Sequence, residues 1–531
     1  MKKTFVLLST LFVATTLLAQ SPQTSIDAAT QLRKFHQFFS YLNGSYVEEI
    51  DMEPLIEKAI VEMLSELDPH SAYINAEDMK GVNESFEGEF SGIGIEFNIL
   101  KDTIIVVNTI VGAPAESVGM IPNDRIVKVD GEDVVGTTQA KVPSYLRGER
   151  GSKVALEVIR HGEDEPLSFI IERDNIPINT VDAAYKLNET TGYIKVNRFG
   201  QTTYSEFYDS FKQLAPLETL VLDLRGNGGG LLTQAIELAN FFLPYRALIV
   251  STEGRMQDDF SMNAYRKGEF TQGNVVVIID EDSASASEIV AGALQDWDRA
   301  IILGRPSFGK GLVQRQFELL DGSAARITVA RYHTPSGRVI QRPYTDGDSK
   351  GYYERHVARY GKADSLATSD TVDDRPEYKT LRLGRTVYGG GGITPDIIVD
   401  RDTTVVSPYY ISLIRQSVVN EFVIDYLDRN RDTLTASYPT FELYNDNFII
   451  DDVILDSLME LGKAKGVDNG EYTIEDFRDI AQVNMKALIA QKLFSTTEFY
   501  RVVNENNNTI FRELDDLLDN WDNRQAEIFG L

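Results

Sequence analysis

Residues 177–400 alternate short apolar segments with amphipathic ones, and this alternation restricts the choice of fold more than any other feature of the sequence. Segments such as "TLVLDLRG", "NVVVIID" and "RAIILG" have the length and composition of buried strands. Helical patterns such as "LLTQAIELANFFL" and "ASEIVAGALQDW" lie between them. Strands that alternate with helices predict an α/β layer built on a largely parallel sheet. A polar, charged stretch that begins at "PYTDGDSKGYYERH" is expected to be a surface insertion or a mobile loop.

Three other regions differ from this α/β region in their pattern of apolar and polar residues. Residues 21–85 carry apolar residues at helical spacing, and residues 86–176 consist of short β-like runs separated by turns. Residues 401–531 are acidic and helical in pattern, and we interpret them as a separate C-terminal extension. A chain of 531 residues is too long for one ordinary domain. The sequence therefore predicts a multidomain α/β protein with a helical N-terminal region, a β-rich domain, an α/β core and a helical tail.

The N-terminus has the order of a secretory signal peptide. Lys2 and Lys3 precede an apolar run from Phe5 to Leu18, and small or polar residues follow. We assign residues 1–20 to the signal and expect an exported protein, with the periplasm of a Gram-negative bacterium as the preferred location. An uncleaved membrane anchor is the alternative, although the apolar run is short for a membrane span.

Charge and cysteine content exclude several classes of function. The formal net charge is −29, whereas binding to nucleic acid through phosphates needs clustered Lys and Arg. The chain has no cysteine. It therefore contains no disulfide, thiol nucleophile, lipidated cysteine or Cys-ligated zinc site.

A run of alternate serines, Ser283, Ser285 and Ser287, leads directly into a helical pattern. Ser285 and Glu288 fit a capping box, in which a hydroxyl and a carboxylate satisfy free backbone N–H groups. Alternatively, one of the hydroxyls is a nucleophile at the positive end of a helix. The local sequence does not choose between these roles.

The segment "GRPSFGKGLVQRQFELL" satisfies the pattern G-x-x-x-x-G-K at Gly304 to Lys310. A phosphate-binding loop would next need Ser or Thr for magnesium and then a helix. Here Gly311 follows, and the residues after it alternate like a strand. We therefore reject nucleotide binding and expect Lys310 at the start of a strand, on the same face as Gln314.

Lys310 could act as a base toward a serine only as a neutral amine. The ordinary pKa of lysine is about 10.4, so burial must lower it by several units. Phe308, Leu312 and Val313 could provide apolar surroundings, and Gln314 could orient the amine through a hydrogen bond. A surface lysine on a strand is the alternative.

Histidine offers no clear alternative base. None of the five histidines, His36, His70, His161, His333 and His356, lies in a G-x-S-x-G or H-E-x-x-H setting. We assign His70, which follows a helix in a turn, a structural role. For His333 we prefer a structural or substrate-groove role, although a distant Ser-His-Asp triad is not excluded.

The segment "LVLDLRGNGGGLL" places a glycine cluster between a strand and a helix. Glycines there would let backbone N–H groups approach a substrate oxygen near a positive helix end, as an oxyanion hole requires. A tight turn or a dinucleotide loop are the alternatives. However, Leu231 stands where the pattern G-x-G-x-x-G needs its last glycine.

Residues 86–176 resemble a PDZ domain. Gly92-Ile93-Gly94 occupies the place of the loop whose N–H groups hold a peptide's terminal carboxylate, and "APAESVGMIPNDRIVKVDG" matches the following helix, turn and strand. Pro122-Asn123 replaces the usual glycine before Asp124. Such a domain binds an extended peptide by adding it to a sheet edge.

Over roughly residues 40 to 400 the chain resembles the carboxyl-terminal processing proteases, also called tail-specific proteases. The matching pieces are "LSELDPHSAYI", "FSGIGIEF", "LVLDLRGNGGGLL", "EDSASASEIVAGALQD", "GRPSFGKGLVQ", "YHTPSGRVIQ" and "GGITPDIIV". Gly228 stands where the family usually has Pro or Ser. The resemblance implies Ser285 as nucleophile, Lys310 as base and Gln314 as its partner. It places the oxyanion donors at Gly230 or Gly229 and at Ala286, and leaves Ser283 and Ser287 to capping or packing.

The implied function is an exported serine endopeptidase with a Ser/Lys dyad that cleaves proteins near their C-termini. The PDZ-like domain would capture unstructured C-terminal tails of protein substrates, and Arg147 is a candidate for coupling that domain to the site. No metal or other cofactor is expected. An adaptor protein, and a homo-oligomer formed through the C-terminal extension, are candidate partners. The alternative function is a catalytically idle PDZ-type peptide-binding scaffold.

Overall fold

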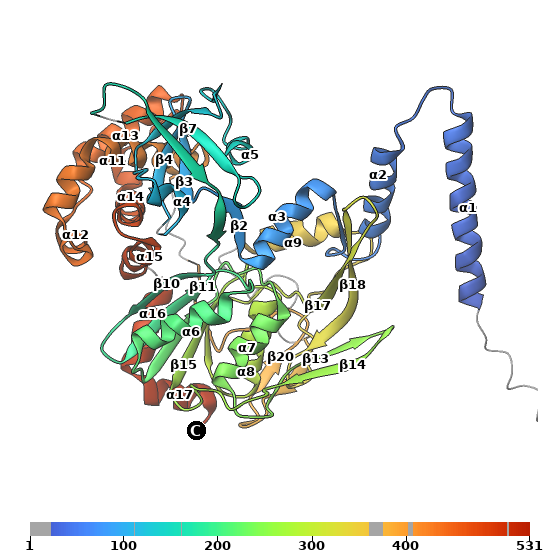
Figure 1. Cartoon of the computed structure of the whole chain (residues 1–531). Coiled ribbons are helices and arrows are strands. Elements are labelled where there is room, and N and C mark those ends of the chain that lie inside the picture. The colour runs from blue at the N-terminus through green and yellow to red at the C-terminus, as the bar shows by residue number, and fades with distance from the viewer. Residues whose placement is uncertain (1–22, 111, 161, 361–374, 402–406, 507–508) are drawn as a thin grey trace, which may run out of the picture. The chain divides into compact units, whose positions relative to one another are not determined.

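The computed structural model describes residues 23–531 apart from 111, 161, 361–374, 402–406 and 507–508 (Figure 1). The chain divides into two compact units, residues 1–66 and 67–531. The predicted signal sequence, residues 1–20, lies outside the described residues. Within the described part of the chain, no helix combines the length and apolarity needed to cross a membrane.

The first unit contains two helices, α1 (Gln23–Ser45) and α2 (Met52–Ser65). The carboxylate of Asp51 accepts the N–H of Glu53 and so begins α2. Helices were expected through residue 85, but residues from Leu67 onward belong to the second unit. There, β1 (Ala72–Ile74) pairs with β18 (Ala324–His333), and α3 (Ala76–Glu87) follows. A three-residue strand is too short to be recognised from the spacing of its apolar residues.

The central sheet of the second unit confirms the predicted α/β layer. Its strands lie in the order β10-β11-β12-β15-β16-β21, and every pair except β10–β11 is parallel. The bounds are β10 (Val181–Lys186), β11 (Thr191–Val196), β12 (Thr219–Asp223), β15 (Asn274–Ile279), β16 (Ile301–Gly304) and β21 (Ile397–Ile398).

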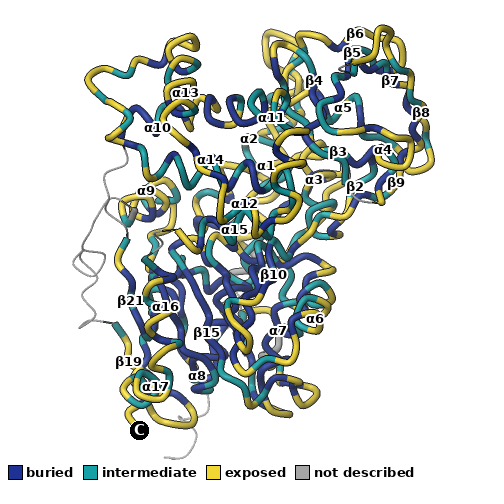
Figure 2. The backbone as a smooth tube through the Cα atoms, turned by 90° about the vertical axis from the view of Figure 1, so that its left-hand side faces the viewer, coloured by how far each residue is buried: buried dark blue, intermediate teal, exposed yellow. Residues whose placement is uncertain are grey.

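Both faces of this sheet are covered, so its central strands are buried throughout (Figure 2). Alternate residues such as Leu222 and Val277 pack against α6 (Thr203–Leu214), α7 (Leu232–Phe242) and α8 (Ala286–Asp296). The intervening residues, such as Val221 and Val276, pack against α16 (Thr509–Asp519) and α17 (Trp521–Phe529). Burial on both faces explains why these strands are continuous apolar runs.

A second, antiparallel sheet contains β1, β18, β13 (Leu248–Gly254) and β14 (Gln257–Asn263), and β17 (Leu312–Glu318) pairs with β18. The predicted strand after Lys310 is therefore confirmed, with a register shift between Val313 and Gln314. The charged insertion contains α9 (Ser349–Tyr360). Its residues 361–374 lie outside the described ones, and the hairpin of β19 (Glu377–Lys379) and β20 (Thr386–Tyr388) follows.

Residues 89–177 form the PDZ-like fold that the sequence predicted. One sheet has the order β3-β4-β5-β7-β8, with β6 on β5, and β2 pairs with β9. Strand β3 lies at an edge of its sheet. The bounds are β2 (Glu89–Gly92), β3 (Ile95–Leu100), β4 (Thr103–Thr109), α4 (Pro114–Ser117), β5 (Arg125–Val129), β6 (Glu132–Asp133), α5 (Val142–Leu146), β7 (Lys153–Ile159), β8 (Leu167–Glu172) and β9 (Asp174–Pro177).

The C-terminal region is helical, as expected, but it does not stand apart from the other domains. Its helices α10 (Pro408–Arg415), α11 (Val418–Ser437), α12 (Phe441–Asn447), α13 (Asp452–Ala464), α14 (Arg478–Leu493) and α15 (Thr496–Glu505) share a hydrophobic core. Ile424 of α11 packs on Leu100, Ile105 and Val107 of the PDZ-like sheet. Helices α16 and α17 cover the central sheet. The region thus contacts both domains.

Candidate functional site

The three serines after β15 have different surroundings. Ser283 and Ser287 are fully buried, and their hydroxyls donate to the carbonyls of Leu224 and Asn227, each at 2.8 Å. Ser285, just before α8, instead lines a cavity of about 460 Å³. Its φ of +55° lies in the left-handed region that non-glycine residues rarely adopt. Packing explains the outer two serines and leaves Ser285 with its side chain in the cavity.

Glu288, in the first turn of α8, joins the serine loop to the segment that carries Lys310. Its buried carboxylate accepts the N–H groups of Ser285, Gly309 and Lys310 at 2.7–2.9 Å. It also accepts the hydroxyl of Ser307 at 2.5 Å. Burial raises the pKa of Glu288, and these donors oppose that rise. The expected helix cap is present, and the same carboxylate fixes the start of the lysine segment.

The glycine cluster after β12 lies directly against the serine loop. A Cβ on Gly229 would be 2.8 Å from the Cβ of Ser285 and 3.0 Å from the nitrogen of Ala286. Gly229 and Gly230 have φ values of +99° and +144°, which favour glycine. The buried side chain of Asn227 donates to the carbonyl of Val196, and its backbone carbonyl accepts from Ser287. The glycines therefore permit the close approach of the two loops.

The predicted oxyanion donors differ in their availability. Gly229 donates its N–H to Oδ1 of Asn227 at 2.9 Å, so this donor is used within the loop. Among the described residues, the N–H groups of Gly230 and Ala286 have no acceptor. Ala286 begins α8, so its N–H lies at the positive end of a helix. The free donors are therefore those of Gly230 and Ala286.

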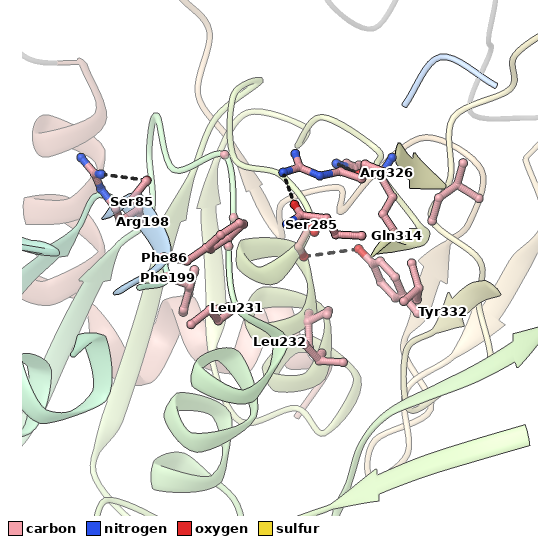
Figure 3. Close-up of a pocket in the computed structure, with 18 residues that line it drawn as sticks. Ser85, Phe86, Arg198, Phe199, Leu231, Leu232, Ser285, Gln314, Arg326 and Tyr332 are labelled. Carbon is pink, nitrogen blue, oxygen red and sulfur yellow. Dashed lines mark hydrogen bonds between the residues drawn. The ribbon is translucent and has the colours of Figure 1, made fainter. Parts of the chain in front are cut away.

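Lys310 lines the same cavity as Ser285 and Gln314, and the latter two are labelled in Figure 3. Nζ of Lys310 donates to Oε1 of Gln314 at 3.0 Å, as the spacing predicted. The pKa of Lys310 is lowered, first by burial and then by the charge of Arg326. The charges of Glu288 and Asp68 oppose this shift. The surroundings of Lys310 thus favour the neutral amine more than water does.

The turn at Asp68–His70 contributes to the site through its backbone. Gln314 donates its Nε2 to the carbonyl of His70, which fixes the amide so that Oε1 faces Lys310. Asp68 accepts the N–H groups of His70 and Ser71 and the hydroxyl of Thr328. The His70 side chain is buried, and burial together with the charge of Lys310 lowers the pKa of its imidazole to about 4. The sequence predicted the turn and a structural role for His70, and only the quoted motif "LSELDPHSAYI" indicated that it belongs to the site.

The rest of the cavity wall is apolar on one side and carries two arginines. Phe199, Leu231, Leu232, Ile289, Leu312 and Tyr332 supply the apolar part. Ser85 and Phe86 reach the cavity from α3, and Arg198 donates to the hydroxyl of Ser85 at 3.3 Å. His333 does not line the cavity and contacts the carbonyl of Gly337 and the carboxylate of Glu253.

The second candidate site, Gly92-Ile93-Gly94, lies between β2 and β3 of the PDZ-like domain. Ile93 is buried, and its carbonyl accepts the N–H of Ala115 at 2.8 Å. The carbonyl of Gly94 accepts the N–H of Ile110 at 3.0 Å. The side chains of Ile95 and Phe97 on β3 and of Tyr145 on α5 are only half-buried against the domain core. The edge strand β3 thus carries apolar side chains that are not fully covered.

Arg147, at the end of α5, connects this domain to the helix whose end lines the cavity of Ser285. Its guanidinium pairs with Glu84 of α3 at 2.7 Å and lies 4.2 Å from the ring centre of Phe90. Glu84 immediately precedes Ser85 and Phe86, which line the cavity. The two candidate sites are therefore linked through one ion pair and one turn of helix.

Comparison with known families finds matches in four segments of the chain. Residues 190–350 match peptidase family S41, and residues 91–171 match the PDZ domain. Residues 9–78 match the N-terminal domain of the activating protease CtpB, and residues 409–495 match a family of unknown function.

Relatives with assigned names extend these matches. A carboxy-terminal-processing protease of Bartonella bacilliformis is 41% identical over 333 residues, which cover 61% of this chain and 76% of that protein. The carboxy-terminal processing protease CtpB of Bacillus subtilis is 35% identical, over 60% of this chain and 70% of that protein. Among solved structures, the photosystem II D1 C-terminal processing protease is 26% identical, covers 70% of this chain and 88% of its own, and has a TM-score of 0.35. By these matches, the chain belongs to the carboxy-terminal-processing proteases, the PDZ-containing serine peptidases of family S41.

Proposed function

We propose that the protein is an exported endopeptidase that uses a Ser285–Lys310 dyad to cleave proteins near their C-termini. One observation carries this proposal: Ser285 and Lys310 line one cavity, and burial there lowers the pKa of the lysine amine. Gln314 orients that amine, and the N–H groups of Gly230 and Ala286 supply the oxyanion hole.

In the first step, Oγ of Ser285 bonds to the carbonyl carbon of the scissile peptide while Nζ of Lys310 takes the hydroxyl proton. Negative charge develops on the carbonyl oxygen, where the N–H groups of Gly230 and Ala286 stabilise it, and such a donor contributes about 3 kcal/mol. The C–N bond then breaks, and the Lys310 ammonium gives its proton to the leaving amine. An acyl ester on Ser285 remains.

In the second step, water attacks the ester while Lys310, now neutral again, takes a proton from it. The C–Oγ bond breaks, and Oγ of Ser285 regains a proton from Lys310. The hydrogen bond from Nζ to Gln314 keeps the amine in place through both steps.

The PDZ-like domain supplies the preference for C-terminal tails in this proposal. An unstructured tail would add a strand to the edge strand β3, with its carboxylate at the N–H groups of Gly92-Ile93-Gly94. The half-buried side chains of Ile95, Phe97 and Tyr145 favour an apolar C-terminal residue. Arg147 is placed to report an occupied domain to α3 through its ion pair with Glu84.

The test compares the mature protein with Ser285→Ala and Lys310→Ala on an unstructured protein that ends in apolar residues. We expect each substitution to reduce the rate at least about 1,000-fold, with fragments identified by mass spectrometry. Ser205→Ala and Lys350→Ala are the matched controls, since both residues are exposed and outside the cavity. Equal cleavage by all variants contradicts the dyad. Binding without cleavage by the wild type supports the idle scaffold instead.

Export is tested separately by the mature N-terminus of the protein made in a Gram-negative host. A chain that begins near residue 21 in the periplasmic fraction supports the proposed signal peptide. A full-length chain in the membrane fraction supports the uncleaved anchor.

A further inference from the structure

Arg326 shares the cavity with Ser285 and Lys310 but has no part in the proposed steps. It lies on β18 opposite Gln316 of β17, and both side chains line the cavity (Figure 3). Its guanidinium is half-buried and donates to Oε1 of Gln316 at a long 3.4 Å. Within the described residues it forms no ion pair with a carboxylate. A positive charge without an acidic partner is therefore placed beside the proposed base.

The two carboxylates that act on Lys310 are already occupied by other donors. Glu288 accepts three backbone N–H groups and the hydroxyl of Ser307. Asp68 accepts two backbone N–H groups and the hydroxyls of Ser71 and Thr328. Their charges favour the ammonium form of Lys310 from α8 and from the turn before β1. His70, in the same turn, adds no positive charge near neutral pH because its pKa is about 4.

We propose that Arg326 is a positioning residue that acts through Lys310, because its permanent charge on the cavity wall keeps the amine of Lys310 neutral near pH 7. The inference rests on the proposed function of Lys310 as the base. Arginine suits this role because it stays protonated at every working pH. Two like charges in one partly dry cavity repel each other, so the lysine, which can lose its proton, does so.

A guanidinium in a substrate cavity could instead bind a carboxylate of the substrate. The two roles differ in what they predict. Charge repulsion alters the pH at which Lys310 becomes neutral, whereas carboxylate binding alters substrate affinity at every pH. The pH dependence of kcat and KM therefore separates them.

The first experiment measures kcat and KM from pH 6 to pH 10 for the wild type, Arg326→Gln, Arg326→Lys and Arg315→Gln. Arg315 is the matched control, because it lies on the same hairpin but is exposed and outside the cavity. For Arg326→Gln we expect the acidic limb to move up by about one pH unit, which reduces kcat about tenfold at pH 7. Its activity should approach the wild-type value at high pH, and Arg326→Lys and Arg315→Gln should keep the wild-type limb.

A loss that is equal at every pH, or that appears only in KM, overturns the proposal in favour of substrate binding. A wild-type profile for Arg326→Gln overturns it as well. If the wild type does not hydrolyse any substrate while Lys310 can still be titrated, the proposed function fails by itself.

The second experiment reads the charge of Lys310 without activity. In a Ser285→Ala background, acetylation of Lys310 by acetic anhydride is followed against pH by peptide mass spectrometry. Half-maximal acetylation should move up by about one pH unit on adding Arg326→Gln, and it should not move on adding Arg315→Gln. An unchanged midpoint with Arg326→Gln contradicts the inference even if the enzyme has lost activity. Because opening of the cavity would also raise the midpoint, Arg326→Lys, which keeps the charge, should leave it unchanged, and an equal rise in both variants contradicts the inference.

Discussion

The glycine loop of the α/β core and the glycine loop of the PDZ-like domain are held in different ways. In the core, buried polar side chains fix Gly226–Gly230: Asn227 binds the loop to itself, and Ser287 binds it from the serine loop. Ser283 binds the carbonyl of Leu224 just before the loop. In the PDZ-like domain, Gly92–Gly94 is held by backbone hydrogen bonds to Ile110 and Ala115 and by packing against Ala113. Chemistry needs donors fixed in place, whereas capture of varied tails needs an accessible strand edge.

The α/β core and the PDZ-like domain also differ in how they contact the C-terminal helices. The C-terminal helices cover the central sheet with a buried apolar cluster that includes Phe511 and Leu514. They meet the PDZ-like sheet through Ile424 and through ion pairs such as Arg125–Asp428 at 3.0 Å. Ion pairs near the surface contribute little to stability. The C-terminal helices therefore hold the PDZ-like domain more weakly than they hold the central sheet. A substitution in the glycine loop of one region should leave the function of the other region largely unchanged.

Among the substitutions that compare the two glycine loops, Gly229→Ala should have the largest effect. The new Cβ would lie 2.8 Å from the carbonyl of Ala284 and from the Cβ of Ser285, at a φ of +99°. We expect kcat to fall about 100-fold or more, as for the loss of an oxyanion donor, because the two loops must separate. Fluorescence anisotropy of a labelled peptide should show unchanged capture by the PDZ-like domain.

Gly226→Ala is the control for this substitution. Gly226 lies in the same loop with a φ of +70°, but a Cβ there meets nothing within 4 Å. It should retain most activity, and an equal loss in both variants would attribute the effect to backbone strain instead of contact between the loops.

The second effect is a pH dependence of the free energy of unfolding, which comes from His70. The folded-state pKa of His70 is about 4, against 6.5 in the unfolded chain. The unfolded chain binds a proton at His70 more readily than the folded protein does. The free energy of unfolding is therefore highest above pH 6.5 and decreases as the pH falls from 6.5 toward 4. The loss is at most about 3 kcal/mol, and it should be smaller in His70→Gln.

Urea unfolding followed by tryptophan fluorescence measures this change, since Trp297 lies in the core beside α8 and Trp521 begins α17. His36→Gln, on the exposed surface of α1, is the control and should keep the wild-type slope. A slope that is unchanged in His70→Gln would assign the acid sensitivity to other groups.

The smallest effect is expected for Gly94→Ala in the PDZ-like loop. The added Cβ would lie 2.2 Å from the Cβ of Ala113, at a φ of +77°. We expect KM for a substrate with an apolar C-terminus to rise about tenfold, a loss of about 1.4 kcal/mol in binding, with kcat on short peptides unchanged. Gly112→Ala is the matched control, because its φ is +76° and a Cβ there meets nothing within 4 Å. A drop in kcat on short peptides would mean that the two regions are coupled more tightly than their contacts indicate.

The sequence was sufficient for the parts of the fold that depend on local pattern. The parallel strands of the core are apolar on both faces, and the helices between them have a clear period, so both were predictable. Lys310 and Gln314 were placed on one strand face by their spacing, and the structure joins them by a hydrogen bond. Contacts between distant segments were not predictable in this way. The pairing of β1 with β18 and the packing of α16 on the central sheet depend on residues far apart in the chain.

Within the candidate site, the choice between Gly229 and Gly230 also depended on a distant contact. Both glycines fit the motif equally well, and only the position of the Asn227 side chain shows which N–H is already used. Likewise, the carbonyl of His70 that orients Gln314 carries no signature in residue type, because every residue has one.

The Asn227 contacts have a consequence for how this part of the molecule would open. One residue accepts from Ala284, Ser287 and Gly229 and donates to Val196 of the neighbouring strand. Because one residue makes all these bonds, Ser285 and the N–H groups of Gly230 and Ala286 are expected to detach from the sheet together, as one cooperative unit. The Lys310 segment is bound to this unit through Glu288, which accepts the N–H groups of Ser285, Gly309 and Lys310, so separating the base from the serine loop requires the loss of that carboxylate's contacts.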